Sequence, residues 1–247
     1  MPFLAIDPAS AFVVLLLAGF VPPLLFAMLL RNAERHRREP WRAVLNAFAW
    51  GGTIAVFLAV AAELLLSSWF TGYDPVFGLV PLSVVVLAPL AEETAKSLGL
   101  FLIPDPDPEP EDGLVYGGAV GLGFAATENV LYVGVAYLID GADVALATAV
   151  YRGFVTVALH GAASAIAGYG IWRARHFGRD GAALGGVLLA MLVHAAYNWI
   201  VSEGSGAAAL AAGVAAVVLF FAGVRRRVKA LDRRGQGFQA WPPLPPP

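Results

Sequence analysis

The chain has 247 residues, of which 59% are hydrophobic and only 14% are charged, and its mean hydropathy is +0.71. Soluble domains carry about 25% charged residues, so this composition excludes an ordinary soluble domain and predicts a membrane protein. The absence of cysteine excludes disulfides, thiol catalysis and thiolate metal sites, and the formal net charge of −2 conceals a strong sorting of charges along the chain.

Seven apolar segments follow one another along the chain, each long enough to cross a bilayer as a helix. They cover about residues 11–30, 44–68, 79–103, 114–139, 144–172, 182–201 and 207–224. We therefore expect an all-α, polytopic membrane helix bundle of seven spans, forming a single unit over residues 1–225. Residues 226–247 are basic and then proline-rich, and we expect them to form a disordered cytoplasmic tail.

Basic residues gather in three segments, 31–42, 173–179 and 225–234, which follow the first, fifth and seventh spans. Seven spans place all three on one side, and positive residues mark the cytoplasmic side. The N-terminus is then outside and the C-terminus inside, in a multi-pass protein of the cell membrane. The arginine runs flank membrane spans, and this position explains them better than nucleic-acid binding does. The acidic, proline-rich segment 104–113 and residues 69–78 are expected to be solvated loops.

The third span contains the sequence EETAK, with Glu92, Glu93 and Lys96 near its middle. Each ionised side chain at the centre of a membrane helix costs about 2.5–3.5 kcal/mol, so three within five residues indicate a specific role. Glu92 and Lys96 share a helix face and can pair, whereas Glu93 points about 100° away, toward another partner.

Three later spans also carry polar residues: Glu128 and Asn129 in the fourth span, Arg152 and His160 in the fifth, and His194 and Asn198 in the sixth. Glu128, His160 and His194 lie at depths similar to that of Glu92, whereas Arg152 lies nearer the outer end of its span. In the fifth span Arg152, Thr156, His160 and Ser164 recur every four residues and define one polar face. Lipid cannot solvate such faces, so we expect these groups to converge inside the bundle. In the fourth span, Gly117 and Gly121 form a GxxxG pair that lets another helix approach closely.

These residue types suggest proton transfer involving water. A glutamate (Glu92, Glu93 or Glu128) would act as general base, His160 or His194 would pass a proton to a leaving amine, and Asn198 would donate to an oxyanion. Lys96 and Arg152 would tune the glutamates. A metal-free site is preferred, while a zinc site formed by His160, His194 and Glu128 is the metal-dependent alternative. Purely structural ion pairs between helices, and an Arg152 that snorkels to the interface, remain the plainer interpretations.

The motifs Glu92-Glu93-Thr94-Ala95-Lys96 and Phe124-Ala125-Ala126-Thr127-Glu128-Asn129, together with His160 and His194, resemble those of the PrsW family of intramembrane proteases. That family is related to the CAAX prenyl protease and bacteriocin-processing (CPBP) superfamily. The superfamily pattern has an arginine four residues after the second glutamate and a histidine where Glu128 stands, so these departures favour PrsW. His194-x-x-x-Asn198 does match the superfamily pattern.

The resemblance covers about residues 88–200 and implies an intramembrane endopeptidase that acts on a membrane-anchored protein. The proposed partner is a single-span protein such as an anti-sigma factor. Family members are also described as metalloproteases, so the resemblance leaves zinc open. Two other classes fit the polar residues: a proton-coupled transporter, which would need paired helix breaks in two halves, and a non-catalytic membrane scaffold.

Overall fold

The computed structural model describes residues 8–69, 82–103, 108–203 and 207–235, in which all regular elements are helical. The all-α expectation is confirmed for these residues. The elements are α1 (Pro8–Arg31), α2 (Trp41–Trp50), the π-helix η1 (Gly51–Ala55), α3 (Val56–Trp69), the π-helix η2 (Ser83–Leu87), α4 (Ala88–Leu100), α5 (Asp112–Ile139), α6 (Ala142–Tyr151), the π-helix η3 (Arg152–Thr156), α7 (Val157–Phe177), α8 (Ala182–Glu203) and α9 (Ala207–Gly235).

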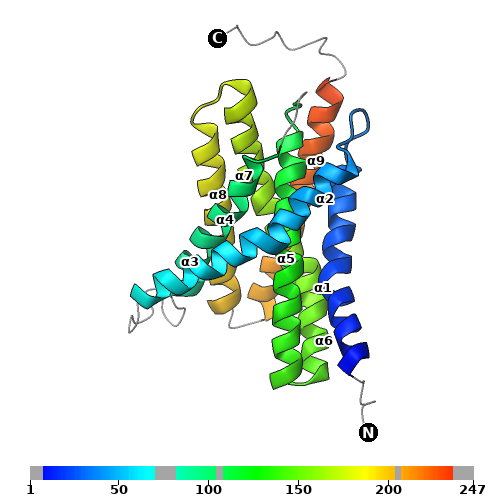
Figure 1. The fold of residues 1–247 in the computed structure, drawn as a ribbon, viewed down its shortest axis with the longest axis vertical. Coiled ribbons are helices and arrows are strands. Elements are labelled where there is room, and N and C mark those ends of the chain that lie inside the picture. The colour runs from blue at the N-terminus through cyan, green and yellow to red at the C-terminus, as the bar shows by residue number, and fades with distance from the viewer. Residues whose placement is uncertain (1–7, 70–81, 104–107, 204–206, 236–247) are drawn as a thin grey trace.

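The π-helical segments join neighbouring helices, so the described residues form seven continuous rods that run alternately up and down (Figure 1). Five rods have the length and hydropathy of membrane spans: Phe12–Arg31, Trp41–Leu66, Asp112–Ile139, Ala142–Phe177 and Ala182–Ser202. The other two are η2–α4, which carries the three ionised residues of EETAK, and α9. Large apolar side chains such as Phe57, Leu138 and Leu219 are 69–82% exposed on the outside, as lipid contact requires.

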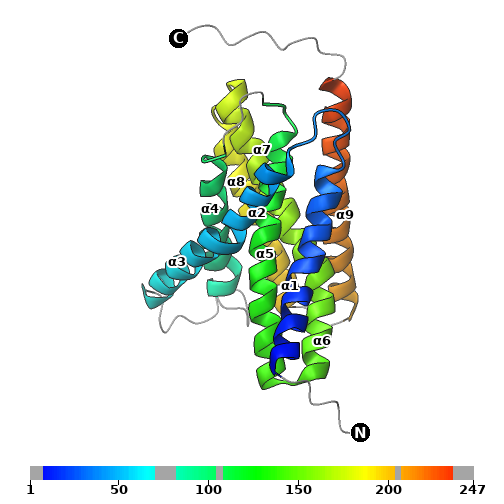
Figure 2. The same ribbon diagram turned by 45° about the vertical axis from the view of Figure 1, so that its right-hand side comes forward.

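Helix α5 lies at the centre of the bundle and packs most extensively against α7, with α1 and α2 on its other sides (Figures 1 and 2). The glycines of the GxxxG pair make the α5–α7 contact possible. A Cβ atom at Gly121 would lie 2.1 Å from the His160 carbonyl oxygen, and one at Gly117 would lie 2.3 Å from that of Ser164. The expected close helix approach is therefore confirmed, and it brings the backbone of His160 against α5.

The acidic segment before α5 differs from the solvated loop expected for it. Residues 104–107, like 70–81, lie outside the described part of the chain, but Glu111 and Asp112 are buried. The Asp112 carboxylate accepts a hydrogen bond from the Glu109 backbone amide at 2.5 Å, and Gly113 lies against Trp172. The expectation is wrong for this part of the segment because α5 begins there and packs on α7.

The expected disordered tail is also wrong for its first ten residues. Helix α9 continues to Gly235, because Val228 and Leu231 extend its buried face beyond the apolar span. The Asp232 carboxylate accepts hydrogen bonds from the backbone amides of Arg35 and His36 at 3.0 and 3.1 Å, which ties α9 to the α1–α2 connection. Residues 236–247 lie outside the described residues.

Candidate active site in the helix bundle

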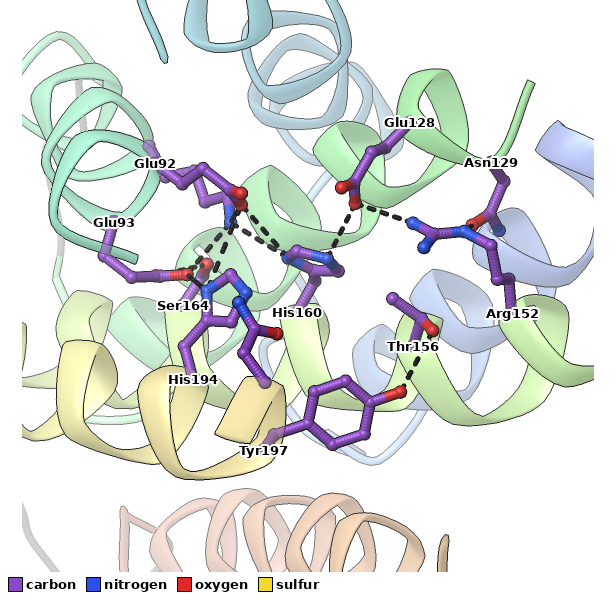
Figure 3. A network of polar contacts seen from close by, with 12 residues as sticks. Glu92, Glu93, Glu128, Asn129, Arg152, Thr156, His160, Ser164, His194 and Tyr197 are labelled. Carbon is purple, nitrogen blue, oxygen red and sulfur yellow. Dashed lines mark hydrogen bonds and ion pairs between the residues drawn. The ribbon is translucent and has the colours of Figure 1, made fainter. Parts of the chain in front are cut away.

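Lys96 lies at the centre of a buried polar cluster formed by side chains of α4, α5, α7 and α8. Figure 3 shows the glutamates and histidines of this cluster. Its Nζ atom is 2.9 Å from Glu92 Oε2, 2.9 Å from Glu93 Oε1 and 2.9 Å from His160 Nδ1. The ammonium also lies 3.9 Å from the centre of the Phe124 ring, a cation–π contact. The Glu92–Lys96 pair is as expected, and Lys96 additionally contacts Glu93 at the i,i+3 position. All three ammonium protons therefore have acceptors within the site.

Glu93 is fully buried, and both of its carboxylate oxygens are engaged. Oε1 accepts from Lys96 and lies 3.0 Å from His194 Nδ1, while Oε2 accepts from the Ser164 hydroxyl at 3.1 Å. Because an ionised carboxylate only accepts, the His194 Nδ1–H donates to it. This leaves Nε2 as the ring nitrogen of His194 that can accept a proton. Glu93 thus orients His194, Lys96 and Ser164 from three helices.

Glu92 has a different environment from its neighbour. Lys96 holds its Oε2, which lies 3.8 Å from His160 Nδ1 and 4.0 Å from His194 Nδ1. Its side chain is 8% exposed, against 0% for Glu93. Among the described residues, no hydrogen bond or ion pair engages Glu92 Oε1. Glu92 therefore keeps one carboxylate oxygen available to a water molecule.

His160 lies between Lys96 and Glu128. Lysine has no acceptor atom, so His160 Nδ1 must accept from Lys96, and Nε2–H donates to Glu128 Oε2 at 2.9 Å. Both nitrogens of His160 are therefore occupied. The ring lies 4.9 Å from that of His194, with the two planes nearly perpendicular, so the two imidazoles are direct neighbours.

Arg152 belongs to the site. Its Nη2 lies 2.8 Å from Glu128 Oε2, its Nε donates to Asn129 Oδ1 at 3.0 Å, and its guanidinium covers the Tyr132 ring at 3.9 Å. With only 13% of the side chain exposed, it does not snorkel to the interface. The pair Glu128–Arg152 therefore continues the polar network from His160 toward Asn129, as Figure 3 shows.

The remaining sequence-predicted residues lie at the edge of this network. Asn198 donates to the Val84 carbonyl at 2.9 Å, and Thr156 lies 3.3 Å from the Tyr197 hydroxyl, which is 2.9 Å from that of Tyr151. The two tyrosines had no sequence signal other than their place in apolar helices. Phe124 and Tyr132, which cover the two cations, lie one helical turn from Glu128 on either side, and that spacing is a signal that could have found them.

Two of the three π-helical segments lie directly before site helices. η2 precedes α4, and η3 begins with Arg152 and precedes the part of α7 that carries His160. A π turn interrupts the regular backbone ladder and is often found at functional sites. Val84, whose carbonyl accepts from Asn198, lies in η2, and Arg152 is the first residue of η3. Such segments are not visible in apolar periodicity, so the sequence did not predict them.

Four ligand atoms from Glu92, Glu93, His160 and His194 lie within 4.8 Å of one another, and all four residues are buried. These donor types fit a zinc ion, which would polarise a carbonyl group and activate water. The group differs from the expected His160, His194 and Glu128, because Glu128 binds the far nitrogen of His160. The Lys96 ammonium already contacts three of the four residues, so a metal ion there would require Lys96 to leave or lose its proton.

Buried glutamates and histidines held on several apolar helices fit a membrane-embedded hydrolase, and comparisons with known proteins identify this class. A model of the PrsW family, described as intramembrane metalloproteases, matches residues 39–224. The protease PrsW of Clostridioides difficile (strain 630) is 28% identical over 194 residues, covering 75% of this chain and 78% of the relative.

The proteins named protease PrsW from Geobacillus kaustophilus (strain HTA426) and Bacillus subtilis (strain 168) are 28% and 26% identical. Each match covers 75% of this chain, and the matched regions make up 79% and 81% of the two relatives. No solved structure matches this chain. The chain belongs to the PrsW family of intramembrane proteases, and it is a multi-pass membrane protein of the cell membrane. This membership favours a peptidase over the proton-coupled transporter.

Proposed function

We propose that the chain is a glutamate-dependent intramembrane endopeptidase that hydrolyses a peptide bond of a membrane-anchored protein without a metal ion. One observation carries the proposal: the two adjacent glutamates have different roles. Glu93 is enclosed by three donors, whereas Glu92 keeps a carboxylate oxygen without a partner among the described residues. Glu92 is therefore the general base, and Glu93 is the group that positions His194 and Lys96.

In this mechanism Glu92 accepts a proton from water as the water oxygen attacks the carbonyl carbon of the peptide. His194 accepts a hydrogen bond from the same water through Nε2. When the carbon–nitrogen bond breaks, the proton held by Glu92 passes to the leaving amine nitrogen, so the residues return to their starting protonation. Glu128 and Arg152 hold His160, which in turn fixes the Lys96 ammonium beside Glu92.

The Lys96 ammonium supplies positive charge at the place where the metal alternative would put an ion. It contacts both glutamates and His160, and the Phe124 face supports it from the other side. A fixed charge in a site that excludes most water stabilises nearby negative charge more strongly than it would in solution. This is the physical reason to prefer the metal-free mechanism.

The proposed topology has seven spans, with the N-terminus outside and the C-terminus in the cytoplasm. It is supported by the seven alternating rods and by basic residues at the ends of α1, α7 and α9, which lie at the same end of the bundle (Figure 2). The proposed substrate is a single-span protein of the anti-sigma factor type. A chain with its scissile bond inside or beside the membrane could reach a site that lies between helices at membrane depth.

The test is cleavage of reporter-tagged single-span proteins by the purified enzyme in lipid vesicles. We expect Glu92→Gln to lower the cleavage rate by about 10²–10⁴-fold, the usual contribution of a general base, while the helical content is retained. Glu109→Gln is the matched control, because the Glu109 carboxylate pairs with Arg37 at 3.3 Å, outside the cluster. It should retain most of the activity.

The same assay with a chelator, together with metal analysis of the protein, tests the metal-free mechanism. We expect activity to survive chelation and metal to be well below one ion per chain. Activity that chelation abolishes and zinc restores would overturn the mechanism but not the peptidase assignment. Full activity in Glu92→Gln would overturn the assignment of the base.

A further inference from the structure

A cavity of about 490 Å³ lies outside the polar cluster of the candidate active site, between the α1–α2 connection and the C-terminal part of α9. Figures 1 and 2 show these two segments side by side at the end of the bundle where α9 ends. The cavity is lined by Ala33, Arg35, His36, Lys229, Asp232 and Arg233. Four of these six residues are basic, and they come from segments almost 200 positions apart in sequence.

Asp232, the acidic residue that lines this cavity, is bound to the other side of its wall. Asp232 accepts from the backbone amides of Arg35 and His36, and its Oδ2 lies 3.1 Å from His36 Nδ1. Burial would raise the pKa of Asp232, but the hydrogen bonds from Arg35 and His36 outweigh burial and hold it below its usual value. Asp232 therefore stays ionised and joins the two segments.

Three other side chains leave positive charge at the cavity. Within the described ranges, no carboxylate forms an ion pair with Arg35, Lys229 or Arg233. The only described bond among their charged groups is from Arg233 Nε to the Lys229 carbonyl, 3.0 Å long. Cations held together without anionic partners repel one another, so a ligand that neutralises them is favourable.

The position of the cavity along α9 indicates which kind of anionic ligand it would bind. The apolar part of α9 ends at Val224, and Lys229 and Arg233 lie about 6 and 12 Å beyond Arg225 at the standard helical rise. That depth matches the headgroup layer of a bilayer. In the proposed topology this is the cytoplasmic leaflet, where anionic lipids gather and where basic pockets between helices hold lipid phosphates.

We propose that this cavity binds the phosphate of an anionic phospholipid headgroup. Phosphate oxygens would accept charge-assisted hydrogen bonds from Arg35, Lys229 and Arg233, and the volume suits a small ligand such as a glycerophosphate group. The bound lipid would clamp the α1–α2 connection to α9, so binding should stabilise the folded protein. The site is independent of catalysis, and the inactive Glu92→Gln variant should bind the same lipid.

The test measures the thermal unfolding temperature of the full chain in detergent with three probes: short-chain phosphatidylglycerol, short-chain phosphatidylcholine and inorganic phosphate. We expect phosphatidylglycerol to raise the temperature with saturation, and the other two to have little effect at the same concentration. In the double variant Lys229→Gln/Arg233→Gln, the affinity for phosphatidylglycerol should fall about tenfold or more, because two of the three basic side chains that would bind the phosphate are lost.

The matched control is Arg173→Gln/Arg226→Gln, which removes the same charge at residues that do not line the cavity. Its affinity should remain close to that of the unmodified chain. Equal loss in both double variants would show non-specific attraction and overturn the proposal, as would saturation by inorganic phosphate alone. If the cavity variant unfolds, Arg35→Gln and native mass spectrometry of the bound lipid give the same comparison.

Discussion

At the scale of single residues, the site depends on the inability of lysine to accept a hydrogen bond. Lys96 donates to Glu92, Glu93 and His160, and this sets the proton positions around it. His160 must accept at Nδ1 and donate at Nε2, and its acceptor is Glu128. Arg152 then determines where the Glu128 carboxylate lies. Arg152 is thereby coupled to Lys96 through three contacts, which are Arg152–Glu128, Glu128–His160 and His160–Lys96.

Arg152 gives a testable prediction at this scale. Arg152→Gln removes the guanidinium that binds both Glu128 and Asn129, and we expect kcat to fall about 10–100-fold with little change in KM, the usual effect of a positioning residue. Arg152→Lys keeps the charge but not the fork geometry, so it should recover only part of the loss. Arg173→Gln serves as control, because the described contact of the Arg173 side chain is with the Tyr169 ring, outside the cluster. Equal kcat in all four proteins would contradict the role.

At the scale of helices, the site is assembled by close contact between α5 and α7. Glycines on α5 let the two backbones approach, and this places Glu128 of α5 beside His160 of α7. The π-helical segments η2 and η3 then adjust where α4 and α7 begin. The polar groups are therefore positioned by helix packing, not by loops.

The α5–α7 contact predicts a specific effect of adding one methyl group. Gly121→Ala would place a Cβ atom 2.1 Å from the His160 carbonyl oxygen, so the helices must separate. We expect destabilisation of about 1–3 kcal/mol, the usual effect of overpacking, and loss of most cleavage activity because His160 moves. Gly134→Ala on the same helix meets only the Leu15 side chain at 3.5 Å and should change little. Unfolding temperatures and cleavage rates of both variants decide this prediction.

At the scale of the whole molecule, charge is sorted between the two ends of the bundle. The α5–α6 connection carries Asp140 and no basic residue, whereas the opposite end carries the three basic segments. That end also buries Glu34, Glu39, Glu111 and Asp232 among the connections. The stability of this end of the bundle should therefore depend on pH. The side of the membrane on which this end lies can also be determined by experiment.

The topology predicts opposite labelling of two single cysteines. The chain has no cysteine of its own, so Asp140→Cys and Arg179→Cys can each be introduced without background. Both positions are exposed, in the α5–α6 and α7–α8 connections. In intact cells a membrane-impermeant maleimide should label only Asp140→Cys, and Arg179→Cys should react only after the cells are opened. The reverse pattern would invert the proposed orientation.

Glu34 predicts how stability changes with pH. The pKa of Glu34 is raised from 4.5 to about 8. Burial is the largest cause, the hydrogen bond from the Glu39 amide opposes it, and the nearby Glu39, Glu111 and Asp232 add to the rise. The folded protein therefore binds more protons than the unfolded chain between these values, so the stability contribution present at low pH is lost as pH rises through 8. We expect the unfolding temperature to fall between about pH 5 and 8, and Glu34→Gln to flatten this dependence. The exposed Asp180→Asn should leave the slope unchanged.

The amino-acid sequence by itself determined the membrane class, the apolar helices, the polar residues of the cluster and the family. These follow from composition and local spacing, because a bilayer tolerates few ionised groups and makes them conspicuous. The sequence did not predict that α9 extends past the membrane or that Glu111 and Asp112 are buried, because both depend on contacts with distant segments.

Only the tertiary structure decided the chemistry assigned to each group. Glu92 and Glu93 are adjacent in sequence, yet Glu93 meets Ser164 and His194, which lie 71 and 101 residues away, while Glu92 keeps a free oxygen. Likewise, Arg152 binds Glu128 because α5 and α7 pack closely enough to bring the two side chains together. Hydrogen-bond partners across helices depend on helix packing and side-chain rotamers, and spacing along one chain segment contains neither.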